Sequence, residues 1–146
     1  VLMTKERQLY IKHTYVFGCL RDAAKHTKRG RGTLQRYVAA TLQVSPNTIL
    51  IKDRFVPEEP ETDETLPVYL DIAGVRNPST GARNVRYRIA ANDGWECDFI
   101  LEFDKTIVSR QEMEAVLLDA GRLVGLGDGR SVGYGRFQTL AFEIDD

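Results

Sequence analysis

The feature that constrains this chain most is a dense run of glycines late in the sequence. Residues 125–137 read Gly-Leu-Gly-Asp-Gly-Arg-Ser-Val-Gly-Tyr-Gly-Arg-Phe. Glycine adopts positive φ angles without steric cost and lets a second stretch of backbone approach closely. The run therefore predicts a tight, shaped loop, and it stands between a predicted helix and a predicted strand.

The side chains within this loop are of the kinds that bind a polyanion such as a nucleic acid. Arg130 and Arg136 supply guanidinium groups, Ser131 supplies a hydroxyl, and Tyr134 supplies an aromatic face. Such groups, with backbone N–H groups, hold phosphates and stack bases. No Gly-Lys-Ser/Thr closes the run, and a helix precedes it, so neither a P-loop nor a dinucleotide-binding fingerprint fits. The alternative interpretation is a turn that only packs.

The run resembles the C-terminal glycine-rich loop of the RAMP superfamily, the RNA-binding and RNA-processing proteins of CRISPR systems. That loop reads Gly-hydrophobic-Gly, then a spacer, then Gly-hydrophobic-Gly. The matching segments are residues 125–127 and 133–135, with residues 128–132 as the spacer. The match covers under a tenth of the chain. The resemblance implies RNA binding and a ferredoxin-like fold.

The order of predicted elements agrees with that fold. Alternating apolar patterns predict strands at residues 8–17, 48–52, 95–103 and 137–144, and a hairpin at residues 68–89. Helical apolar patterns predict one helix at residues 33–44 and a second helix that begins at the capping box formed by Ser109 and Glu112. With the hairpin as an insertion, the order is βαββαβ, an α+β fold with an antiparallel sheet packed against two helices. We expect one ferredoxin-like domain over residues 3–146, with the glycine-rich loop before the last strand and an acidic, proline-rich loop at residues 56–67.

Charge and composition limit the classes of ligand and the cellular location that we expect for this protein. The net charge is −1, so nucleic acid would be attracted only by local basic clusters. Two cysteines and two histidines lack metal-ligand spacing, and we expect no metal and no cofactor. No apolar run is long enough for a membrane and no signal-peptide pattern is present, so we expect a cytoplasmic protein without a membrane partner.

Two further basic segments extend the predicted binding surface, although solvated faces would explain them as well. One is the segment at residues 25–31, and the other is one face of the strand at residues 83–89. The predicted RNA-binding residues are Gly127, Gly129, Arg130, Ser131, Gly133, Tyr134, Gly135, Arg136, Arg86, Arg88, Lys28, Arg29 and Arg31.

Three functions follow from these patterns. The first is a non-enzymatic module that binds RNA or another single-stranded nucleic acid, as a subunit of a CRISPR-type ribonucleoprotein. The second is a phage or mobile-element protein that docks on, or mimics, a subunit of a CRISPR complex, with the acidic loop facing its partner. The third is a metal-independent endoribonuclease that uses His26 and Lys28. RAMP proteins that cleave RNA generally carry two ferredoxin-like domains, which favours the non-enzymatic reading.

Overall fold

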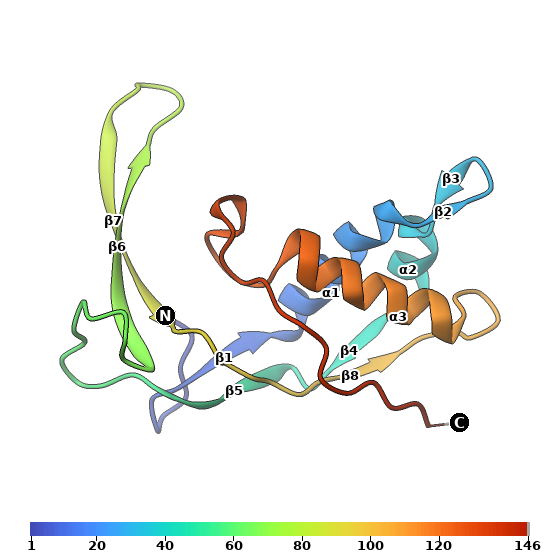
Figure 1. The fold of residues 1–146 in the computed structure, drawn as a ribbon, viewed down its shortest axis with the longest axis horizontal. Helices are drawn as coiled ribbons and strands as arrows, with labels where there is room; N and C mark the ends of the chain where they lie inside the picture. Colours follow the sequence, from blue (N-terminus) through green and yellow to red (C-terminus); the bar gives the residue numbers. More distant parts are fainter. Residues whose placement is uncertain (146) are drawn as a thin grey trace. The chain divides into compact units, whose positions relative to one another are not determined.

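A computed structural model describes residues 1–145, which form two compact units (Figure 1). The first unit comprises residues 1–11 and 49–98, and the second comprises residues 12–48 together with the chain from residue 99 onward. Three α-helices and small two-stranded sheets make up this described part, so the α+β class is confirmed. Each of these helices is too short or too polar to span a lipid bilayer.

The first unit is built from strands. β1 (Gln8–Lys12) pairs with β5 (Thr48–Phe55), and β6 (Val68–Arg76) pairs with β7 (Arg83–Ala91) as an antiparallel hairpin. The hairpin confirms the sequence prediction, and its strands are longer than predicted. The core of this unit consists of four buried side chains from β1, β5, β6 and the residue that follows β5: Leu9, Ile51, Val68 and Val56. Trp95 and Cys97 pack against this core.

The second unit is built mainly from helices. α1 (His13–Ala23), α2 (Gln35–Thr41) and α3 (Arg110–Asp119) accompany a short antiparallel pair of β4 (Gln43–Ser45) with β8 (Ile100–Glu102). The α1 side chains at Val16, Cys19, Leu20 and Ala23 are buried, at the spacing of one helix face. A 3₁₀ turn, η1 (Ala24–His26), then leads into a small hairpin of β2 (Lys28–Arg29) and β3 (Gly32–Thr33).

The start of α3 follows the predicted capping box. The Ser109 hydroxyl accepts a hydrogen bond from the Glu112 backbone N–H (3.1 Å), and the Glu112 carboxylate accepts one from the Ser109 backbone N–H (2.9 Å). Two backbone donors at the helix start, which have no partner inside the helix, are thereby satisfied. Met113, Val116 and Leu117 form the buried stripe of α3.

The predicted strand at residues 8–17 is wrong in its second half, because α1 begins at His13. Thr14, Tyr15, Val16 and Phe17 favour strands by intrinsic propensity. That preference is overridden because residues 16, 19, 20 and 23 share one buried helix face. The basic segment that was predicted to follow a strand therefore follows a helix.

The predicted strand at residues 95–103 forms only in part. Its alternation is present, since Trp95, Cys97, Phe99, Leu101 and Phe103 are half-buried while the residues between them are exposed. Ladder pairing is confined to β8, and farther upstream the Lys52 N–H donates to the Glu96 carbonyl (2.8 Å). An alternating pattern reports which face is covered, but a strand also needs a paired backbone.

The predicted last strand at residues 137–144 is not formed, since these residues pair with no strand of the described chain. Its start is held by one backbone bond, from the Phe137 N–H to the Gly121 carbonyl (3.2 Å). Apolar alternation along these residues therefore does not translate into a ladder.

Candidate nucleic-acid interface

The glycine-rich loop leaves α3 through a wider helical turn, η2 (Ala120–Val124), and returns across that same turn (Figure 1). Gly121 is buried there, and a side chain at this position would run into the Phe137 backbone. One bond closes the loop, from the Leu126 N–H to the Gly135 carbonyl (3.0 Å). The two ends of the loop are therefore fixed by backbone contacts that need small residues.

A short 3₁₀ turn, η3 (Arg130–Val132), shapes the interior of the loop. Gly129 and Gly133 flank it in the left-handed conformation, and the Gly129 carbonyl accepts bonds from Val132 and Tyr134 (3.1 Å each). The Tyr134 ring lies against Gly129, where an added Cβ would come within 2.6 Å of the ring. This confirms the prediction of a tight, shaped loop.

The loop presents the predicted side chains to solvent. Arg130, Ser131 and Arg136 are exposed, and Tyr134 is exposed over 47% of its surface. The N–H groups of Leu126, Val132, Gly133 and Tyr134 are already donated inside the loop. These four N–H groups are therefore not available to a phosphate, and any contact from these residues would have to come from their side chains. Gly133 has no side chain, so this applies most directly to its predicted role in RNA binding.

A pocket of about 450 Å³ lies between α1 and the loop. Thr14, Tyr15, Gly18, Arg21 and Asp22 of α1 line one side, and Gly127, Asp128 and Arg130 line the other. Two cations, two carboxylates, a hydroxyl and a phenol thus share one surface hollow. The sequence prediction included Gly127 and Arg130 but missed the α1 residues, because residues 13–17 were assigned to a strand. The helical spacing of Val16, Cys19, Leu20 and Ala23 is the signal that could have found them.

Electrostatics link the same elements. Burial raises the pKa of the Cys19 thiol to about 11, and the positive charges of Arg130 and Arg136 oppose that rise. Arg21 is itself held by the neighbouring Asp22 carboxylate (3.3 Å). The charges of the two predicted loop arginines therefore influence the pKa of a residue on α1, the helix that forms the other side of the pocket.

We expect the stability of the second unit to fall as the pH rises from about 9 towards about 11. The thiol loses its proton in the unfolded chain near its ordinary value of 9.0, whereas in the folded unit it stays protonated to about 11, so alkaline pH favours unfolding. Urea unfolding of wild type and Cys19→Ala across this range measures the effect. The variant should lose part of the pH dependence, whatever its stability at neutral pH, and an unchanged dependence would contradict the assignment.

The basic segment at residues 25–31 has a structural role in part. The Arg29 guanidinium bonds the Glu112 carboxylate (2.7 Å) and lies over the Tyr37 ring, 4.5 Å from its centre. Lys28 and Arg31 are exposed on the hairpin, and His26 is exposed on the turn before it. Arg29 thus joins the hairpin to α2 and α3, and of the three predicted cations Lys28 and Arg31 are the more accessible.

Arg86 and Arg88 belong to the first unit, whereas the glycine-rich loop belongs to the second. Arg88 is half-buried and faces the Asp71 carboxylate at 3.8 Å. Arg86 is exposed on the same strand. These two residues are therefore not gathered with the loop in one compact unit.

Within residues 1–145, no three His, Cys, Asp or Glu side chains come together as a group that could hold a metal ion. Comparison of the sequence with protein-family models and with curated proteins yields no match.

Proposed function

We propose that this protein is a non-enzymatic, RAMP-like module that binds single-stranded RNA, with its elements in a ferredoxin-like arrangement. The observation that carries this proposal is the pocket between α1 and the glycine-rich loop, which is lined by Arg21 on one side and Arg130 on the other. Two cations that approach from separate elements can hold a phosphate between them, and the exposed Tyr134 offers a face for a base.

The tight loop supports this proposal by fixing its side chains in advance. Its backbone bonds and left-handed glycines leave Arg130, Ser131 and Arg136 on a rigid frame. Side chains displayed on a preorganised loop lose less conformational entropy when a ligand binds. Arg21 joins the predicted residues as a contributor from α1, and Lys28 and Arg31 are further candidates on the β2–β3 hairpin.

The test is a fluorescence-anisotropy titration of the full chain with a single-stranded RNA at two salt concentrations. Replacement of both loop arginines, Arg130→Ala with Arg136→Ala, should weaken binding at least about tenfold. The negative slope of log affinity against log salt should become shallower by about 1.4. A matched control, Lys5→Ala with Arg110→Ala, removes the same charge from exposed positions outside the loop and should bind nearly as wild type does.

Equal affinity of the loop variant and wild type would refute the proposal. A gel of the same RNA separates binding from chemistry, because intact RNA fits the module and cleaved RNA would move the assignment to His26 and Lys28. Absence of binding at low salt would instead favour the protein that docks on, or mimics, a CRISPR complex subunit.

A further inference from the structure

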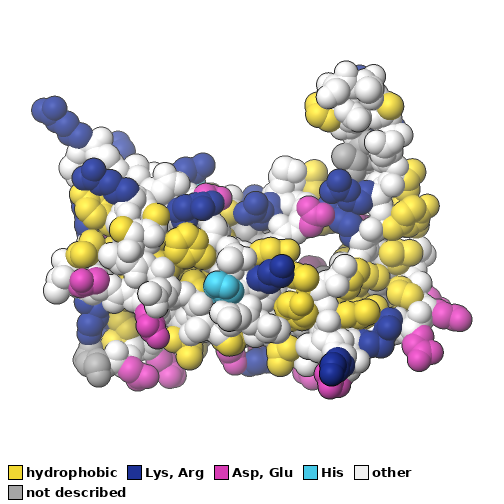
Figure 2. Space-filling view, turned by 180° about the vertical axis from the view of Figure 1, so that it is seen from behind, with side chains coloured by type: hydrophobic (Ala, Val, Ile, Leu, Met, Phe, Trp, Pro, Cys, Tyr) yellow, Lys and Arg dark blue, Asp and Glu magenta, His cyan; other side chains and the backbone are white. Residues whose placement is uncertain are grey.

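The β6–β7 hairpin has one apolar face that runs from the core of the first unit to solvent. The register places Val68, Leu70 and Ile72 opposite Ala91, Ile89 and Tyr87, on one face of the two strands. Val68 is 3% exposed at the base of the hairpin, whereas Ile72 is 51% and Tyr87 is 65% exposed farther out. Val85, one step nearer the tip on the same face, is 61% exposed. The space-filling view shows hydrophobic side chains along one side of this arm (Figure 2).

The opposite face of the hairpin carries a paired acid and base. Asp71 and Arg88 are direct cross-strand partners, and their charged groups lie 3.8 Å apart with most of each side chain covered. The exposed Ile72, Val85 and Tyr87 side chains therefore lie on the face away from this ion pair. A two-stranded hairpin is marginally stable in water by itself, and burying its apolar face against another surface would stabilise it.

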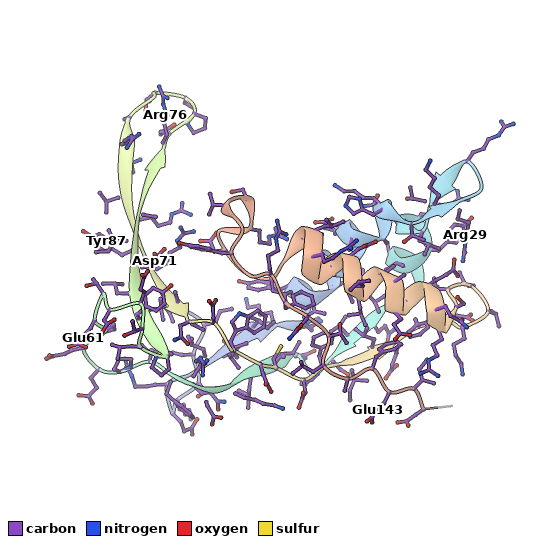
Figure 3. All side chains as sticks on the ribbon, in the orientation of Figure 1. Arg29, Glu61, Asp71, Arg76, Tyr87 and Glu143 are labelled. Carbon is purple, nitrogen blue, oxygen red and sulfur yellow. The ribbon has the colours of Figure 1, made fainter. Side chains whose placement is uncertain are left out.

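Charge divides the hairpin into two ends (Figure 3). Arg76 and Arg83 are exposed partners at the tip, where the strands end. The acidic loop stands at the other end, and all five of its carboxylates, within residues 58–64, are exposed. The loop is tied to the base of β6 by a bond from the Leu70 N–H to the Glu61 carbonyl (2.7 Å). The tip is thus basic, and the base is flanked by an acidic segment.

We propose that the apolar face of this arm packs against the same face of a second copy of this chain. The two arms run antiparallel about a two-fold axis. Each tip, with Arg76 and Arg83, then lies at the base of the partner's arm, beside its acidic loop.

The antiparallel arrangement follows from charge complementarity. A two-fold interface brings the same surface of both copies together, so that surface must be complementary to itself. In antiparallel arms the basic tip meets the acidic loop twice, whereas parallel arms would place tip against tip and loop against loop. Strands of nine residues extend about 30 Å, so the arm can carry its tip well away from its own loop.

Sedimentation equilibrium of the full chain, without nucleic acid, tests the proposal. Wild type should show a concentration-dependent dimer that weakens as salt rises. A tip variant, Arg76→Glu with Arg83→Glu, and a loop variant, Glu58→Lys with Glu59→Lys, Glu61→Lys and Glu64→Lys, should each dimerise at least about tenfold more weakly, because like charges then face each other. An equimolar mixture of the two variants should recover the dimer, since both contacts become attractive again.

The mixture distinguishes charge repulsion from misfolding, because a variant with a misfolded hairpin would not form the mixed dimer. Tyr87→Ser should also weaken the wild-type dimer by removing apolar area without a change of charge. A wild type that stays monomeric at every concentration would overturn the proposal. So would charge variants that dimerise as wild type does, or a mixture that remains monomeric. Since Arg130 and Arg136 lie outside the arm, failure here leaves the RNA-binding test unaffected.

Discussion

Gly135→Ala is expected to lower the free energy of unfolding of the second unit by about 3 kcal/mol or more. Gly135 has a φ of +81°, where a side chain is strained, and an added Cβ would run into the backbone of Leu126. Leu126 cannot easily retreat, because it is 8% exposed and its N–H bonds the Gly135 carbonyl at 3.0 Å. Relief of the clash would require the loop to open at its closing bond.

Gly127→Ala is the matched control for this effect. Gly127 has nearly the same φ, +82°, but an added Cβ would meet nothing within 4 Å. This variant should therefore cost only the left-handed strain, about 1–2 kcal/mol. Urea unfolding of both variants measures the difference. Equal losses would mean that conformation alone, and not close backbone approach, explains the glycine at position 135.

Glu112→Ala is expected to destabilise the second unit by about 2 kcal/mol, since it removes two interactions at once. The carboxylate completes the capping box of α3, and it also accepts the Arg29 guanidinium at 2.7 Å. Arg29 would keep its contact with the Tyr37 ring. Glu112→Gln is the control, because its amide oxygen can still accept the Ser109 N–H while the negative charge is lost, so it should cost about half as much.

The same residue gives an acid dependence. The hydrogen bond from the Ser109 N–H, with the Arg29 charge, holds the pKa of the Glu112 carboxyl below its ordinary value. A carboxyl with a lowered pKa stabilises the folded state above the unfolded value of about 4.5, and that contribution is lost as the pH falls through the folded value. Urea unfolding at neutral and acidic pH should therefore show a smaller acid loss in Glu112→Ala than in wild type. An equal loss would assign the acid sensitivity to other carboxyls.

Local features of this fold could be predicted from the sequence, and tertiary features could not. The capping box needs only Ser109 and Glu112, three positions apart, and the β6–β7 hairpin needs only two alternating runs around a turn. The Arg29–Glu112 pair joins residues 83 positions apart, and no pattern in either segment signals it. The glycine-rich loop was predicted correctly because its shape is enforced by its own glycines.

The candidate site was only half predictable for a related reason. The loop residues of the pocket are visible in the sequence, whereas Thr14, Tyr15 and Arg21 enter it only because residues 13–23 form a helix. Strand-forming side chains at residues 14–17 mask that helix, and packing decides between the two. The unformed strand at residues 137–144 reflects the same limit, because alternation does not say whether a partner strand is present.

The division of the chain into two interleaved units also sets the order in which they can be completed during synthesis. α1 packs against α3 and η2, and the Cys19 thiol lies 3.9 Å from the Ala120 carbonyl, yet about a hundred residues separate these partners. All of residues 49–98, which belong to the other unit, are made in between. The apolar face of α1 therefore stays without its α3 and η2 partners until that part of the chain has been synthesised. The first unit can finish folding before the core of the second unit is complete.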